Sequence, residues 1–294
     1  MLGLTQATPD ADRDGLALRS AGRRVPLIRH RFRRSPQDVP HDRVNLRRGL
    51  ACGAFLAADL RLAGDGGFVC LAEADLAEET DGEGPVAALT GERLSQLRLR
   101  GADGRPGPCR VLLLEELIAM VSGSDTAPGA TVLVTLRDPA AAMDRLAIGG
   151  FARLVAPVAD RLVLSGQDPA AVAALAAEVP GLACGWDPSA LLWQAWPAGA
   201  PRARVLVDRI VAQAGPEWRI ALTGTFVAAA DRLGVDAVGN LRDAGLRVDC
   251  TGLHSAGDDA VDRLSLCLAR GCDGIVTAAP IALERLAREA GLGD

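Results

Sequence analysis

The chain has 294 residues, of which 49% are hydrophobic, and its formal net charge at pH 7 is −5. This length is enough for one large α/β domain with a sizeable core, and the negative charge argues against a general affinity for nucleic acid or anionic membranes. No apolar run reaches the roughly 18 residues that a membrane-spanning helix requires. The absence of lysine from the sequence excludes Schiff-base chemistry.

The first 24 residues show no sustained hydrophobic periodicity and are predicted to form a loose N-terminal arm, followed by a single domain over 25–294. The arm is acidic and has neither the basic segment nor the apolar segment of a signal peptide. The seven cysteines include no CxxC pair and mostly lie in apolar runs, which is typical of reduced, packed thiols. We therefore expect a cytoplasmic protein without integral membrane association.

Short apolar runs alternate with helix-like segments along the rest of the chain. Eight runs are predicted as strands: 25–28, 54–60, 131–136, 160–165, 181–186, 234–239, 245–250 and 273–277. Apolar strands joined by amphipathic helices indicate a parallel sheet that is covered by helices. Eight such units match the size of a (β/α)8 TIM barrel. The alternative, a doubly wound sheet, is disfavoured because no Gly-x-Gly-x-x-Gly follows the first strand.

A long polar insert, about residues 72–108, interrupts the second βα unit after its strand. We expect it to cover the C-terminal mouth of the barrel, where barrel enzymes place their active sites. The sequence leaves open whether the insert acts as a lid or as a contact surface.

Several short motifs occur in a fixed order along these units. They are His30-Arg31-Phe32, Ala57-Ala58-Asp59, the Asp65-Gly66 hairpin leading to Ala72-Glu73, Leu114-Glu115-Glu116, Thr135-Leu136-Arg137 and Asp273-Gly274-Ile275-Val276-Thr277-Ala278. In this order the chain resembles the glycerophosphodiester phosphodiesterase family, whose pattern runs His-Arg-Gly, Glu-x-Asp, His-Asp, Leu-x-Glu, Glu-x-Lys and Asp-Gly-Ile-x-Thr-Asp. The resemblance implies a barrel that cleaves glycerol phosphodiesters to glycerol phosphate and an alcohol, using a divalent cation and two histidines.

The resemblance also implies roles for individual residues. Asp59 and Glu116 are expected to hold Mg²⁺ or Ca²⁺, and His30 to serve as the acid/base catalyst. Arg31 and Arg137 are expected to bind the phosphate, Arg31 through the paired hydrogen bonds that a guanidinium group can donate. Structural alternatives stay open, because Asp59 could simply pair with an arginine and Glu116 could be a helix-start residue that the helix dipole favours.

The chain departs from the family pattern at reactive positions. Ala57 stands in place of a metal ligand, Ala72 in place of the second histidine, and Thr135 in place of a third-strand glutamate. A positioned acid or base contributes typically about 10² to 10⁴ in rate, so we predict weak or lost hydrolytic activity. His41 and Glu73 are the residues that could replace the missing groups from neighbouring positions.

Two functions remain open at this point. The first is a phosphodiesterase-like protein that acts on a small phosphodiester. The alternative is a non-catalytic barrel that binds a phosphorylated small molecule or a protein partner. Neither function involves nucleic acid, and the sequence predicts no oligomeric state.

Overall fold

The barrel consists of parallel strands that close into a ring. The computed structural model describes residues 14–194, 196, 199–253 and 259–292. Within them the parallel strands are β2 (Arg23–His30), β3 (Phe55–Leu62), β7 (Thr131–Leu136), β8 (Leu162–Gly166), β9 (Ala183–Trp186), β10 (Arg219–Thr223), β11 (Arg247–Thr251) and β12 (Gly274–Thr277). Pairing of β12 with β2 and of β2 with β3 closes the sheet. The predicted (β/α)8 TIM barrel is confirmed.

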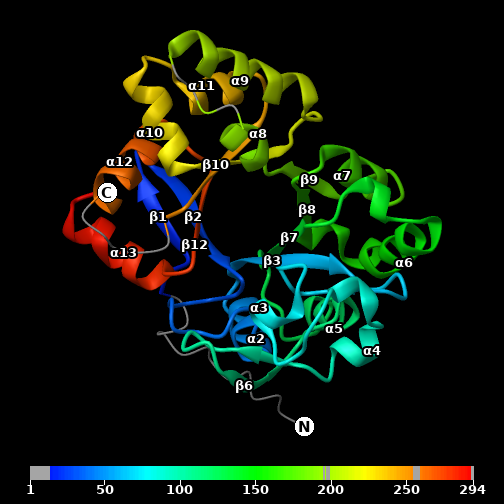
Figure 1. The fold of residues 1–294 in the computed structure, drawn as a ribbon. Coiled ribbons are helices and arrows are strands. Elements are labelled where there is room, and N and C mark those ends of the chain that lie inside the picture. Colours follow the sequence, from blue (N-terminus) through cyan, green and yellow to red (C-terminus); the bar gives the residue numbers. More distant parts are fainter. Residues whose placement is uncertain (1–13, 195, 197–198, 254–258, 293–294) are drawn as a thin grey trace.

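Helices surround the ring and cover its outer face (Figure 1). They are α2 (Arg43–Ala51), α5 (Leu114–Val121), α6 (Arg145–Val155), α7 (Pro169–Ala176), α8 (Ser189–Gln194), α9 (Ala200–Gln213), α10 (Gly224–Arg232), α11 (Ala237–Asp243), α12 (Ala260–Ala269) and α13 (Pro280–Glu289), with 3₁₀ turns η2 (Ala140–Ala142) and η3 (Ala156–Arg161). Aspartates begin several of them, and their carboxylates accept backbone N–H groups of the first turn, as at Asp42, Asp144, Asp168 and Asp236. No helix of the described residues is long and apolar enough to cross a membrane.

One predicted strand is wrong. Residues 234–239 lead into helix α11, and the sixth barrel strand is β10. The reason is that a short apolar run has the same pattern in a buried strand and in a buried helix start. Val235, Ala237 and Val238 are buried, and Asp236, which lies among them in the sequence, is the N-cap of helix α11.

The chain enters the barrel through a hairpin. Strand β1 (Ala17–Ser20) pairs antiparallel with β2, and Leu18 is buried in the core. The described part of the predicted arm is therefore paired with the first barrel strand, and β2 begins at Arg23, slightly before the predicted domain start. Residues 1–13 of the arm lie outside the described residues.

The insert has a small core of its own. It comprises β4 (Phe68–Val69), α3 (Leu76–Glu79), η1 (Val86–Ala88), α4 (Gly91–Leu94), β5 (Arg98–Arg100) and β6 (Pro106–Arg110). The side chains of Leu71, Leu76, Val86 and Leu94 pack together there, separately from the two main core clusters. Figure 1 shows α3, α4 and β6 near α2 and α5, at one side of the barrel. We predicted that the insert covers the mouth, but none of its described residues lines the cavity there.

Candidate ligand-binding site at the barrel mouth

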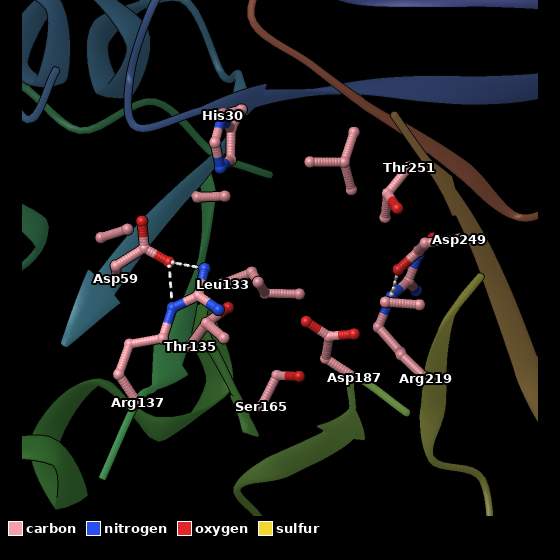
Figure 2. Close-up of a pocket in the computed structure, with 14 residues that line it drawn as sticks. His30, Asp59, Leu133, Thr135, Arg137, Ser165, Asp187, Arg219, Asp249 and Thr251 are labelled. Atoms are coloured by element: carbon pink, nitrogen blue, oxygen red, sulfur yellow. Dashed lines mark hydrogen bonds and ion pairs between the residues drawn. The ribbon is translucent and has the colours of Figure 1, made fainter. Parts of the chain in front are cut away.

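A cavity of about 160 Å³ opens among the C-terminal ends of the strands. His30 ends β2, Thr251 ends β11, and Arg137 and Asp187 directly follow β7 and β9. Its lining residues are His30, Ala57, Ala58, Asp59, Leu133, Thr135, Arg137, Ser165, Asp187, Arg219, Ala221, Asp249, Thr251 and Val276 (Figure 2). This is the end of the barrel where active sites are found, and it contains three of the residues predicted from the sequence: His30, Asp59 and Arg137.

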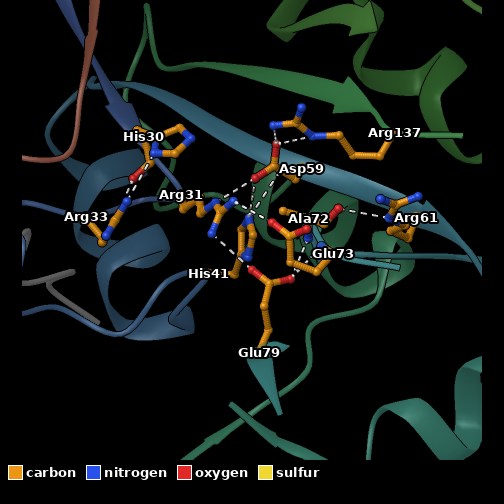
Figure 3. Close-up of polar contacts among 10 residues, drawn as sticks. All are labelled: His30, Arg31, Arg33, His41, Asp59, Arg61, Ala72, Glu73, Glu79 and Arg137. Carbon is orange, nitrogen blue, oxygen red and sulfur yellow. Dashed lines mark hydrogen bonds and ion pairs between the residues drawn. The ribbon is translucent and has the colours of Figure 1, made fainter. Parts of the chain in front are cut away.

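The carboxylate of Asp59 is held by two arginines. Arg137 donates from Nε and Nη2 to Oδ1 at 2.8 and 2.5 Å, and Arg31 donates from Nε to Oδ2 at 2.7 Å (Figure 3). The Asp59 side chain is only 4% exposed. Burial alone raises the pKa of this carboxyl, but Arg137 and Arg31 lower it more, so the net pKa lies well below the usual range. Asp59 is therefore ionised, with a guanidinium group on each oxygen.

Glu116, the second predicted metal ligand, is placed elsewhere. It lies in the first turn of α5, where its Oε2 accepts the backbone N–H of Leu113 and pairs with Arg43 at 2.5 Å. It does not line the cavity. Glu116 is therefore a helix-start residue, which is the structural alternative given in the sequence analysis.

The neighbour of Asp59 in the sheet register is Thr135, which itself pairs with Ser165 on β8.

The residues at the mouth do not fit a divalent cation. Mg²⁺ and Ca²⁺ need several oxygen ligands, yet both oxygens of Asp59 are taken by arginine, and position 57 is alanine. Across the described residues, no group of three or more His, Cys, Asp or Glu side chains could hold a metal ion. Guanidinium groups instead lie where the resemblance places the metal.

His30 is set up as a hydrogen-bond donor to the cavity. Nη2 of Arg33 lies 3.1 Å from its Nδ1. Because a guanidinium group has no acceptor, Nδ1 must accept this hydrogen bond, which leaves the proton of the ring on Nε2. The ring faces the cavity in Figure 2. A neutral imidazole with Nε2–H can donate to an anion, but it cannot act there as a general base.

The loop at position 72 is closed by a carboxylate from the insert. Glu79, in α3, accepts the backbone N–H groups of Ala72 and Glu73 at 2.6 and 3.0 Å through Oε2, and its Oε1 accepts from Nη1 of Arg31 at 3.0 Å (Figure 3). The Glu73 side chain is 54% exposed and lies 4.0 Å from Arg31. The place of the missing histidine is thus part of a fixed ion-pair network, which the sequence did not predict.

His41 supports Asp59 and is not a replacement catalyst. The backbone N–H of Asp59 donates to its Nε2 at 3.1 Å, and the ring is fully buried. Burial lowers the pKa of His41 to about 3, with Asp59 opposing the shift and Arg31 adding to it. The ring is therefore neutral at physiological pH and fixes the backbone of β3 beside the site.

The backbone of this loop adopts left-handed conformations at non-glycine residues. The φ angles are +53° at Arg31, +63° at Phe32 and +57° at His41. Such conformations cost of order 1–3 kcal/mol each and persist only when packing fixes them. Phe32 is fully buried and packs edge-on against His41, with ring centroids 5.7 Å apart. Tertiary packing therefore positions Arg31 to reach both Asp59 and Glu79.

No family model and no curated protein sequence matches the chain. Solved structures do match it. A putative glycerophosphoryl diester phosphodiesterase from Silicibacter pomeroyi is similar with a TM-score of 0.66 and 21% identity, over 95% of this chain and 97% of that chain. The chain has the fold of this phosphodiesterase.

Two further structures agree. An Oleispira antarctica phosphodiesterase, solved with the product sn-glycerol-3-phosphate, gives a TM-score of 0.64 and 16% identity, over 90% of this chain and 97% of that one. A glycerophosphodiester phosphodiesterase from Agrobacterium tumefaciens gives a TM-score of 0.62 and 19% identity, over 90% of this chain and 99% of that chain. The resemblance drawn from the motifs is thus confirmed at the level of the fold.

Proposed function

We propose that this protein is a divergent member of the glycerophosphodiester phosphodiesterase family that binds a small phosphorylated molecule at the barrel mouth and hydrolyses it weakly or not at all. The observation that carries the proposal is the pairing of both Asp59 oxygens with guanidinium groups of Arg31 and Arg137. Phosphodiester cleavage in this manner requires a cation that stabilises charge developing on the phosphoryl oxygens, and both oxygens of the predicted metal ligand Asp59 are already paired with guanidinium groups.

The same residues support binding of an anion. The guanidinium group of Arg137 lines the cavity, Arg31 holds the other oxygen of Asp59, and Arg33 contacts the ring of His30. Nε2–H of His30 and the hydroxyl groups of the lining add hydrogen-bond donors to the cavity. The sn-glycerol-3-phosphate bound to the Oleispira antarctica phosphodiesterase makes this compound the first ligand to test.

Calorimetric titration with sn-glycerol-3-phosphate in the presence of EDTA tests binding, and release of choline from glycerophosphocholine with added Mg²⁺ or Ca²⁺ tests hydrolysis. We expect metal-independent binding and turnover near background. The variant His30→Ala should weaken binding about tenfold or more, because it removes a donor to a charged group, whereas Arg288→Gln, at a side chain that is 77% exposed, should not. Turnover in the ordinary enzyme range, about 1 to 10³ per second, would contradict the proposal.

A further inference from the structure

The two sides of the mouth cavity present different groups to a ligand. His30 and Arg137 come from the β2 and β7 side, whereas Asp187 and Asp249 come from the β9 and β11 side (Figure 2). The hydroxyl groups of Thr135, Ser165 and Thr251 lie in the same lining. Arg137 is paired with Asp59, and Arg219 is paired with Asp249. A ligand that fills this cavity therefore meets the N–H of His30 and the guanidinium group of Arg137 on one side and the carboxylate of Asp187 on the other.

Asp249 is already neutralised by a partner. Arg219 donates to it from Nε at 2.7 Å and also from Nη2, and the Asp249 side chain is 3% exposed. Gly274 leaves room for this pair, because a Cβ at that position would lie 2.4 Å from Oδ1 of Asp249. The pair is a fixed part of the barrel interior that closes the bottom of the cavity.

Asp187 is the carboxylate that remains for a ligand. Its Oδ1 accepts the backbone N–H of Ser189 at 3.0 Å, in the turn that begins α8. Among the described residues no arginine forms an ion pair with it, although against the lowering effect of burial the charges of Asp59 and, more weakly, Asp187 raise the pKa of Arg137. In Figure 2 its oxygens point toward the middle of the cavity, across from Arg137 and His30. A half-buried carboxylate in this position repels a purely anionic ligand and attracts a cationic group.

We infer that the ligand carries a phosphate and a cationic amine on one short chain, that is, an aminoalkyl phosphate, and that Asp187 selects the amine. This inference rests on the proposed function, since it assigns the phosphate to the side of His30 and Arg137. The volume agrees with a small molecule, because the cavity of about 160 Å³ is smaller than the roughly 300–1,000 Å³ of pockets that hold drug-sized ligands. The hydroxyl groups of the lining complete the hydrogen bonds of either end.

The experiment compares O-phosphoethanolamine with sn-glycerol-3-phosphate by calorimetry, on the wild type and on Asp187→Asn. Asparagine keeps an oxygen that can accept the N–H of Ser189, so the turn before α8 is retained. We expect the wild type to bind the amine-bearing phosphate about tenfold more tightly, and Asp187→Asn to remove that preference. Affinity for sn-glycerol-3-phosphate should stay equal or rise slightly, because a negative charge is removed.

The matched control is Asp75→Asn, an aspartate that accepts a backbone N–H two residues on at the start of α3 and does not line the cavity. It should keep the wild-type preference. Equal affinity of the wild type for both compounds would overturn the inference and leave the proposed function standing. A preference for the amine-bearing phosphate that survives Asp187→Asn would have the same two consequences. Loss of both ligands in Asp187→Asn would assign this residue a structural role and also overturn it. If the wild type binds neither compound, the proposed function itself fails.

Discussion

Arg137 donates two hydrogen bonds to a single oxygen of Asp59, Oδ1, from Nε at 2.8 Å and from Nη2 at 2.5 Å. The two residues lie on neighbouring parallel strands, Asp59 within β3 and Arg137 just after β7. Asp59 is where the sequence resemblance expects a metal ligand. Its partner is instead a guanidinium group, which carries a permanent positive charge and needs no ion from solution.

Replacing Arg137 by glutamine should destabilise the fold. The carboxylate of Asp59 stays buried, with Arg31 as its remaining cation, and removing one partner of a buried pair costs about 3 kcal/mol or more. Urea unfolding at neutral pH measures the loss. The control is Arg270→Gln, because Arg270 is 40% exposed and pairs with Asp231 at the surface, where a pair contributes less than about 1 kcal/mol. Equal losses in the two variants would contradict the prediction.

His41 should make the protein less stable as the pH falls from about 6.5 toward about 3. Its pKa in the folded state is about 3 because of burial, with Asp59 opposing the shift, while the pKa of unfolded histidine is about 6.5. Between these values the unfolded state binds one more proton, so stability falls by up to about 1.4 kcal/mol per pH unit. Asp59, whose folded pKa is lowered below the ordinary value near 4, adds a further loss only at lower pH.

The measurement is the free energy of unfolding of the wild type and of His41→Asn at several pH values between 7.5 and 4. Asparagine accepts the left-handed backbone that His41 adopts, with φ at +57°. We expect the wild-type curve to fall toward acid and the curve of the variant to be flatter in this window. Parallel curves would show that the ring is already protonated or solvated in the folded state.

The alternation of apolar runs and helical segments predicted the barrel, and the resemblance to the family supplied three mouth residues, His30, Asp59 and Arg137. His30 and Arg137 follow apolar strand runs, and such ends must meet at one edge of a parallel barrel. The sixth strand was misplaced because its local pattern also suits a helix start. Glu116, expected at the metal only from the resemblance, lies in the first turn of α5. The pairing of Arg31 with Glu79 depends on the path of the insert and on the left-handed backbone at Arg31. The sequence around these residues predicts neither feature, because Arg31 is not a glycine and the path of the insert is set by tertiary packing.

Replacing Glu79 by glutamine should loosen the loop at Ala72. Glu79 accepts two backbone N–H groups and pairs with Arg31, and an amide has one oxygen and no charge for these partners. We expect faster hydrogen exchange at the amides of Ala72 and Glu73, by about tenfold or more, since hydrogen bonds to charged groups contribute about 1.5–3 kcal/mol. The adjacent Glu78→Gln is the control, because that side chain is exposed. Identical exchange in both variants would mean that the loop is held by other contacts.

The double variant Ala57→Glu with Thr135→Glu should create a response to divalent cations that the wild type lacks. Position 57 lines the cavity with Asp59, and Thr135 is the register neighbour of Asp59, so both new carboxylates would lie beside it. An ion present at about 100 times its Kd stabilises the folded state by about 2.7 kcal/mol. We therefore expect Ca²⁺ to raise the melting temperature of the double variant, reversibly with EDTA, and to leave the wild type unchanged. Adding Glu116→Gln should not affect the response, because Glu116 pairs with Arg43 away from the cavity. A wild-type shift that Glu116→Gln abolishes would return Glu116 to the site and refute the arrangement described.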